Sequence, residues 1–308
     1  MIAVEATPHA DAPTVDAIVV WVWGILHTAV LSDSYRAALV AALALPGNIL
    51  ADTPDGRWAC IVQTCCVTAG GRGEDAIPAA AAAELFMVAL DVLDDEEDGE
   101  ATPLRAAWGA ARALNVSTGL LFLAQRALLA APSGALLLGI VLDAGIHACA
   151  GQHADLAPAA EHGGDPTSAL SVAKGKSASL VAALCQVGAA CAEADAGTQG
   201  LYACFGASLG MTLQLRNDIA AARPGATQKT GIALGRPTLP LAAASRMDVA
   251  RTGGVDGLRA ALQTGEPALL TWTISELYRR HASDLVPALS ADPDDRAALA
   301  RLLRRCEG

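Results

Sequence analysis

Residues 79–98 read AAAAAELFMVALDVLDDEED, a mostly apolar run that ends in five consecutive acidic residues. Alanine and leucine are strong helix formers, so the run predicts a helix with an acidic last turn. At helical spacing Asp94 and Asp98 lie on one face of this helix, with Asp95 beside them. The stretch therefore predicts a D-D-x-x-D group of three carboxylates at the end of an apolar helix.

Like charges this close repel one another, so the acidic turn needs a counter-charge. Mg2+ suits it, because this hard cation usually takes one or two carboxylates together with substrate phosphates. Glu96 and Glu97 point elsewhere on the helix, so we expect them to matter less. When the five acidic residues are considered alone, a solvated helix end is the alternative.

The composition of the whole chain predicts an all-α fold. Of the 308 residues, 53% are hydrophobic and only 4% aromatic, and β-branched runs are rare. No repeat or linker rich in Pro, Gly and Ser divides the chain. We therefore expect residues 1–13 to be unstructured and residues 14–308 to form one domain, a large antiparallel helical bundle around a central cavity.

Glycine and proline divide the sequence into helical segments. Several segments are apolar on nearly all sides, which predicts that neighbouring helices bury them. The expected segments are 15–30, 33–45, 57–70, 76–96, 103–130, 133–152, 167–194, 197–222, 236–247, 255–263, 265–283 and 293–306.

Charge and hydropathy argue against several classes of protein. The formal net charge of -11 disfavours a nucleic-acid partner, which requires a basic surface, and fits a protein that gathers divalent cations. The apolar run 19–26 is too short to span a bilayer, and the N-terminus lacks the basic start of a signal peptide. The eight cysteines form no metal-type C-x-x-C pair. These features predict a cytoplasmic protein with reduced thiols and no transmembrane segment.

Further polar residues lie at the ends of other apolar segments. Taken singly, a glutamine or aspartate at a helix end most often caps it, and a lysine without a carboxylate nearby usually extends to water. Considered together, they are the remaining candidates for a site: Gln152, Asp155, Lys176, Gln214, Arg216, Asn217, Asp218, Lys229 and Arg236.

In their order and spacing, these motifs resemble the trans-isoprenyl diphosphate synthase and class I terpenoid synthase superfamily, from about residue 56 to the C-terminus. Five motifs carry the resemblance in register. They are D-D-x-x-D at 94–98, G-Q-x-x-D-L at 151–156, a lysine at 176 where the family has K-T-A, a reduced second acidic motif at 210–221, and R-P-T-L-P at 236–240.

The resemblance implies that two acidic motifs face each other across a deep apolar pocket. Three Mg2+ ions would join the diphosphate of an allylic prenyl substrate to both motifs. Departure of the diphosphate would produce an allylic carbocation, which dry apolar walls protect from water. The resemblance also implies a homodimer. The expected metal ligands are Asp94, Asp95, Asp98, Asn217 and Asp218.

Basic side chains beside the motifs are the expected partners of the departing diphosphate. Lys176 matches the family lysine directly, whereas Arg216 is the weakest candidate of the set. Lys229 and Arg236 complete the basic candidates. The resemblance also assigns Gln214 to the catalytic residues, and Gln152 and Asp155 to the substrate-binding residues.

Residues before the first acidic motif are expected to line the floor of the pocket. Ala89 and Leu90 lie about one turn before it, with Phe86 and Met87 a further turn down. The small side chain of Ala89 leaves the pocket deep enough for a prenyl chain of 15 or 20 carbons, and Phe86 would close the bottom of the pocket. Ordinary core packing is the alternative at all four positions.

The chain departs from its elongating relatives at the site for a second substrate. Those enzymes bind isopentenyl diphosphate with a G-K-R stretch, a histidine before the first motif and an R-R-G after it. Here the corresponding positions read PDGRW at 54–58, Met87, and GEATP at 99–103, which leaves Arg57 and, further on, Arg105. A second diphosphate would find few cations to balance its charge.

Three functions are therefore open. The first, which the missing cations favour and which we predict, is a Mg2+-dependent class I terpene synthase. It ionises one preformed prenyl diphosphate of 15 or 20 carbons and then cyclises or eliminates. The second is a prenyltransferase that uses isopentenyl diphosphate or another acceptor. The third is a catalytically weak partner subunit of a heteromeric synthase, against which the intact first motif argues.

Overall fold

The computed structural model of the protein describes residues 15–29, 31–52, 56–157, 165–222 and 236–304. The described residues are mainly helical and form no β-strand, which confirms the predicted all-α class. Residues 1–13, which were expected to be unstructured, lie outside the described residues. In chain order the α-helices, the 3-10 helix η1 and the π-helix η2 are α1 (Val15–Thr28), α2 (Asp33–Leu43), α3 (Arg57–Thr68), η1 (Gly73–Ala76), α4 (Ile77–Glu97), α5 (Pro103–Trp108), α6 (Ala110–Leu129), α7 (Gly134–Asp155), α9 (Pro166–Ala173), η2 (Lys174–Ala178), α10 (Ser179–Cys191), α11 (Ala196–Ala221), α13 (Leu239–Ser245), α14 (Asp248–Gln263), α15 (Glu266–Leu289) and α16 (Pro293–Arg304).

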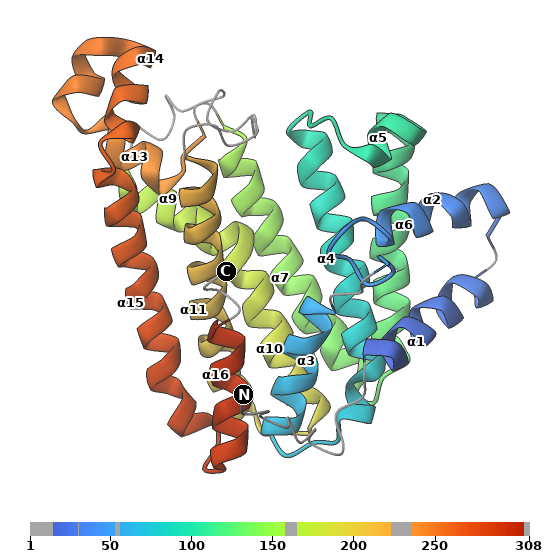
Figure 1. Ribbon diagram of the computed structural model, residues 1–308. Coiled ribbons are helices and arrows are strands. Elements are labelled where there is room, and N and C mark those ends of the chain that lie inside the picture. Colours follow the sequence, from blue (N-terminus) through green and yellow to red (C-terminus); the bar gives the residue numbers. More distant parts are fainter. Residues whose placement is uncertain (1–14, 30, 53–55, 158–164, 223–235, 305–308) are drawn as a thin grey trace, which may run out of the picture.

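The long helices α4, α6, α7, α10, α11 and α15 lie side by side and alternate in direction along the chain (Figure 1). Helix α4 packs against α6 and α3, while α10 packs against α11, α3 and α7. Helices α4, α7 and α11 all end at the same end of the bundle, where α5, α9 and α13 also lie (Figure 1). Three polar helix ends are thereby brought together.

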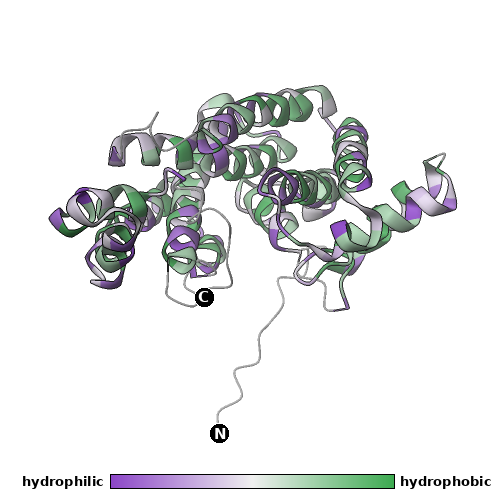
Figure 2. Cartoon of the chain, turned by 90° about the horizontal axis from the view of Figure 1, so that it is seen from above, coloured by the Kyte–Doolittle hydropathy of each residue, from purple (hydrophilic) through white to green (hydrophobic). Residues whose placement is uncertain are grey.

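Small residues allow the central helices to approach closely. Ala79, Ala80, Ala81, Ala82 and Ala83 are all buried, so α4 is enclosed by its neighbours on every side at this level. Hydrophobic residues occupy the sides of the long helices that face one another (Figure 2). The prediction that helices apolar on nearly all sides are buried by neighbours holds for this part of α4.

Local sequence explains where several helices begin and end. The segment expected at 103–130 is two helices, α5 and α6, because Gly109 has φ +77, a conformation that glycine adopts without strain. The segment expected at 167–194 contains the π-helix η2 between α9 and α10. Several of the described helices begin with a side chain that accepts a hydrogen bond from a backbone N–H in the first turn: Ser32, Thr102, Asp165, Asp195 and Asp292.

Two helical stretches are long and apolar enough to cross a membrane by length and composition alone. In Gly73–Glu97, which comprises η1 and α4, 72% of the most apolar window is buried inside the bundle, as in the core helix of a soluble protein. In α7 only 33% of the corresponding window is buried. The outer side of α7 is therefore an apolar surface that the other described residues leave uncovered.

Candidate active site

The acidic end of α4 contacts side chains from α7, from η2 and from the turn before α13. Lys176 Nζ donates to Asp94 Oδ1 at 2.7 Å and to Asp155 Oδ2 at 3.0 Å. Arg236 Nη1 donates to the same oxygen of Asp155 at 3.2 Å, and Arg236 Nη2 donates to Asp98. Three carboxylates and two cations thus alternate without a gap. We call these five residues the ion-pair chain.

The charged residues of the ion-pair chain shift one another's pKa values. Burial alone would lower the pKa of Lys176, but the carboxylates of Asp94 and Asp155 outweigh this effect and raise it. Burial raises the pKa of Asp98, and the charge of Asp94 adds to the rise while Arg236 and Lys176 oppose it. Lys176 therefore remains a cation at the centre of an acidic site.

A glycine contact fixes Asp155 relative to Lys176. A Cβ on Gly151 would lie 2.3 Å from the backbone nitrogen of Lys176 and 2.6 Å from the carbonyl carbon of Gly175. The backbones of α7 and η2 therefore touch, which only glycine permits here. Asp155 follows one turn after Gly151 on the same face of α7. Lys176 itself lies in a π-helix, a form that is frequent at functional sites.

Gln152 joins the ion-pair chain from the last turn of α7. Its Nε2 donates to Asp94 Oδ1 at 2.9 Å and to Glu97 Oε2 at 2.7 Å. Glu97 thus turns toward the site, and the expectation that it points elsewhere is wrong. Its spacing of three residues from Asp94 could have identified it. Glu96 does point away, since its Oε2 accepts from Arg105 Nη1 of α5 at 2.8 Å.

The second motif is linked to the ion-pair chain through η2. Gln214 Nε2 donates to Asp218 Oδ1 at 2.8 Å, and Gln214 Oε1 accepts from the hydroxyl of Ser177. Burial raises the pKa of Asp218 to about 7, with the charge of Asp155 adding to the rise and the hydrogen bond from Gln214 opposing it. Ser177, the residue after Lys176, was not among the predicted site residues. A hydroxyl beside the motif lysine was the only signal for it.

Two expected site residues on α11 do not join this cluster. Asn217 is exposed. Arg216 lies two residues before Asp218 and thus on a different face of α11, where it pairs with Glu276 of α15. Arg279 Nε also donates to Glu276, at 2.7 Å. Arg216 therefore joins two helices, and its expected contact with diphosphate stays a prediction. Lys229, the remaining basic candidate, lies outside the described residues.

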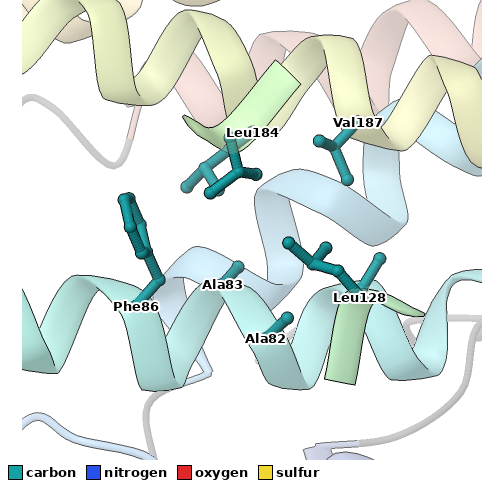
Figure 3. Close-up of a pocket in the computed structure, with 8 residues that line it drawn as sticks. Ala82, Ala83, Phe86, Leu128, Leu184 and Val187 are labelled. Carbon is teal, nitrogen blue, oxygen red and sulfur yellow. The ribbon is translucent and has the colours of Figure 1, made fainter. Parts of the chain in front are cut away.

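An apolar pocket lies between α4, α6, α7 and α10. Phe86, Ala82 and Ala83 on α4 face Leu184 and Val187 on α10 across it (Figure 3). Phe86 precedes the first motif by eight residues, which is about 12 Å along the helix at 1.5 Å per residue. An apolar chain anchored at the acidic end of α4 would run toward this pocket. Its lining residues are Ala79, Ala82, Ala83, Phe86, Leu128, Val141, Leu184 and Val187.

Of the four residues expected to form the pocket floor, Phe86 lines this pocket. Leu90 is half-buried on the same face, between Phe86 and the acidic turn. Ala89 is fully buried, and its carbonyl accepts from Ser117 Oγ of α6 at 2.7 Å. Met87 is buried on a different face of α4 from Phe86. The space in the pocket is therefore due to Ala79, Ala82 and Ala83 rather than to Ala89.

The region aligned with the second-substrate site contains a carboxylate of its own. Glu84 of α4 is only 1% exposed, and its Oε1 accepts from the backbone nitrogen of Ala59 at 2.7 Å, in the first turn of α3. A carboxylate at a helix N-terminus satisfies a free N–H group and the positive end of the helix dipole. Met87 follows Glu84 by one turn of α4. Arg57 is exposed, with its guanidinium 5.4 Å from the ring centre of Trp58.

The donor chemistry at the acidic end of α4 fits Mg2+. Asp94, Asp95 and Asp98 offer carboxylate oxygens, and Oε1 of Gln152 is buried and accepts no hydrogen bond within the described part of the chain. Among the described residues, no three acidic, histidine or cysteine side chains converge to hold an ion by themselves. Mg2+ takes one or two carboxylates and completes its shell with water and substrate phosphates.

Solved structures with this fold include isoprenyl diphosphate synthases. Decaprenyl diphosphate synthase from Rhodobacter capsulatus superposes with a TM-score of 0.81 at 16% identity, covering 94% of each chain. A polyprenyl synthase from Caulobacter crescentus, complexed with calcium and isoprenyl diphosphate, superposes with a TM-score of 0.78 at 20% identity and covers 97% of this chain and 98% of that one. The fold is therefore of the isoprenyl synthase class.

Sequence comparison narrows the class to a family. Residues 55–253 match the model of the polyprenyl synthetase family. The (2E,6E)-farnesyl diphosphate synthases of Mycobacterium tuberculosis and Mycobacterium bovis are 30% identical over 260 residues, which is 80% of this chain. The chain spans 66% of the length of these curated relatives. This protein belongs to the polyprenyl synthetase family.

Proposed function

We propose that this protein is a Mg2+-dependent prenyltransferase whose donor is an allylic prenyl diphosphate of 15 or 20 carbons. The ion-pair chain carries the proposal, because it keeps two charged, largely buried cations beside the carboxylates suited to Mg2+. The farnesyl diphosphate synthase relatives favour prenyl transfer over the terpene synthase function expected from the sequence. The enzyme is therefore proposed to use an acceptor.

The first step is cleavage of the C–O bond between the prenyl chain and its diphosphate. The bonding electrons leave with the diphosphate, and an allylic carbocation remains on the prenyl chain. Lys176 and Arg236 stabilise the negative charge that accumulates on the leaving group, since each has donors beyond those used within the ion-pair chain. When bound, Mg2+ supplies further positive charge to the diphosphate, with these residues as its proposed ligands: Asp94, Asp95, Asp98, Asn217 and Asp218.

The second step consumes the carbocation. The π electrons of a carbon–carbon double bond in the acceptor form the new bond to the prenyl chain, and a proton is then lost from the acceptor. Until this happens, water must be kept away from the cation. The apolar lining of the pocket beside Phe86 serves this purpose. The far end of the prenyl chain is proposed to widen this pocket, whose present volume is about 10 Å³.

A terpene synthase that needs no acceptor is the second candidate, and one local observation favours it. Glu84 is a buried carboxylate at the start of α3, one turn from Met87, in the region aligned with the isopentenyl diphosphate site. A second diphosphate entering there would meet a negative charge and an apolar side chain instead of several cations. The two candidates thus differ in whether isopentenyl diphosphate is used.

Product analysis separates the candidates. The purified protein is incubated with Mg2+ and prenyl diphosphates of 10, 15 or 20 carbons, with and without radiolabelled isopentenyl diphosphate. Prenyl transfer to this acceptor predicts labelled, longer prenyl diphosphates. A terpene synthase predicts a hydrocarbon or alcohol, with diphosphate released at the same rate in both conditions. Absence of turnover with every donor would contradict both candidates and favour a partner subunit of a heteromeric synthase.

We also propose that the protein is a homodimer that associates through α6 and α7. Helix α7 is apolar on nearly all sides, and such a helix is normally covered by neighbours. Phe122 of α6 and Ile146 of α7 are 66% and 67% exposed. Leu129 and Leu136, at the turn between the two helices, are exposed as well. A second copy of the chain would cover these side chains.

The charges on α6 and α7 favour a second copy as the partner. Helix α6 contains Arg112 and Arg126 but no acidic residue, whereas α7 carries the exposed Asp143 and no lysine or arginine. A two-fold axis that brings α6 of one copy against α7 of the other would therefore join opposite charges. The net charge of -11 disfavours an anionic lipid surface instead. We accordingly propose a cytoplasmic enzyme.

A further inference from the structure

Asp155 holds both cations of the ion-pair chain with one oxygen atom. Its Oδ2 accepts from Lys176 Nζ at 3.0 Å and from Arg236 Nη1 at 3.2 Å. The residue is only 6% exposed, at the last position of α7. A buried carboxylate in this place repels a diphosphate, which argues against the direct contact with substrate that was predicted for Asp155.

The two cations have different second partners, and both of these belong to the first acidic motif. Lys176 also pairs with Asp94, and Arg236 also pairs with Asp98. If Asp94 and Asp98 turn their oxygens to Mg2+, these two pairs are lost while the pairs with Asp155 persist. An ammonium has three donors and a guanidinium five, so each cation can bind Asp155 and a phosphate at the same time.

We propose that Asp155 is a positioning residue that keeps Lys176 and Arg236 together while they exchange the motif carboxylates for the oxygens of a diphosphate. This inference rests on the proposed function. Arg236 depends most on Asp155, because its backbone lies outside any helix, in the turn before α13. Lys176 is fixed additionally by the contact between η2 and Gly151.

The charge of Asp155 has two opposite effects on the binding of a diphosphate. Its repulsion of the ligand weakens binding, so removal of the charge would by this effect alone tighten it. Its hold on two long side chains strengthens binding, because these side chains otherwise lose rotamer freedom when the ligand arrives. If Asp155 positions the two cations, the second effect must be the larger, and removing its charge must weaken the binding of a diphosphate. If Asp155 merely neutralises the charge of the two cations, removing its charge must leave this binding unchanged or tighten it.

Calorimetric titration with inorganic pyrophosphate in the presence of Mg2+ measures whether binding weakens or tightens when the charge of Asp155 is removed. Asp155→Asn keeps the shape of the side chain and one acceptor oxygen but removes the charge. We expect the dissociation constant to rise about 10- to 100-fold, as for other residues that orient a ligand-binding group. Asp284→Asn, at an exposed position on α15, is the matched control and should bind as the wild type does. Thermal melting by circular dichroism verifies that each variant is folded.

Asp155→Glu keeps the charge but moves it by one methylene group. If Asp155→Asn fails to fold, this variant still distinguishes positioning of the two cations from neutralisation of their charge. Positioning predicts weaker pyrophosphate binding for this variant, whereas neutralisation predicts wild-type binding. If Asp155 acts through the two cations, Asp155→Asn should cause no further loss in a protein that already carries Lys176→Met and Arg236→Met. A further loss in that background would overturn the inference.

Two other results have distinct meanings. If Asp155→Asn binds pyrophosphate as tightly as the wild type or more tightly, the inference is wrong and the proposed function stands. If the wild-type protein does not bind pyrophosphate with Mg2+ at all, the proposed function is wrong and the inference falls with it.

Discussion

Lys176 and Lys174 lie two residues apart in η2, yet only Lys176 extends to the carboxylates, while Lys174 is exposed. This pair provides a matched comparison within one turn of helix. Lys176→Met should lower kcat/KM roughly 10- to 150-fold, the equivalent of about 1.5–3 kcal/mol for a lost charge-assisted contact. Lys174→Met should change it less than about twofold, as expected for a surface position. Steady-state kinetics with a C15 donor test this, and equal effects of both variants would refute it.

The acidic residues at the end of α4 should not be interchangeable. Asp94→Asn or Asp98→Asn should remove most turnover and raise the Mg2+ concentration that is required, because both lie in the ion-pair chain. Glu97→Gln should have an intermediate effect, since Glu97 shares the amide of Gln152 with Asp94. Glu96→Gln should mainly lower the melting temperature, because Glu96 pairs with α5. Mg2+ titration of turnover and thermal melting measure these effects. Equal, small losses for all four variants would indicate a solvated helix end.

The sequence allowed candidate site residues to be selected, but it did not show which side chains pair with them. Helical spacing was enough to place Asp94 and Asp98 on one face, whereas Lys176 was selected by the resemblance to the family's K-T-A lysine. The partner of Arg236 could not be predicted in this way, since Asp98 lies 138 residues away. Arg216 also stands beside a motif, but the packing of α11 on α15 directs it to Glu276 instead. Two arginines that each stand in or beside a motif thus have different partners.

At the level of whole elements, the helical pattern predicted most segments but not their interruptions. An isolated glycine in an apolar helix is tolerated, so nothing in the sequence around Gly109 required the positive φ that separates α5 from α6. The π-helix η2 depends on contacts with α7, which lie beyond local sequence. The contact of Glu84 with the first turn of α3 joins two neighbouring helices and likewise has no local signature.

Helix α4 should set the length of prenyl chain that the protein accepts. Ala83→Phe would fill the pocket and should shift the preference toward a C10 donor, whereas Phe86→Ala would enlarge it and should favour C20. The physical reason is that a close-packed pocket cannot yield to a longer chain without strain. The ratio of kcat/KM for the two donors measures the shift, with melting temperatures as a check on folding. A shift in the same direction for both variants would show that the chain binds elsewhere.

At the scale of the whole molecule, the uncovered side of α7 predicts assembly. Ile146→Asp places a charge at the centre of the proposed interface, and light scattering after size exclusion should show the mass fall from two chains to one. Leu269→Asp, on the exposed side of α15, introduces the same charge at a residue that is 64% exposed and should leave the dimer intact. A wild-type protein that is monomeric at micromolar concentration would contradict the proposed interface.

The backbone contact between Gly151 and Lys176 restricts how the site can move. Two segments whose backbones touch cannot shift against each other without opening a void or a clash. The end of α7 and η2 should therefore behave as one rigid body, which carries Gln152, Asp155 and Lys176. Any closure around a substrate then falls to the acidic end of α4 and to Arg236. Entry of the substrate and release of the diphosphate would then be controlled by the acidic end of α4 and by Arg236, and not by Lys176.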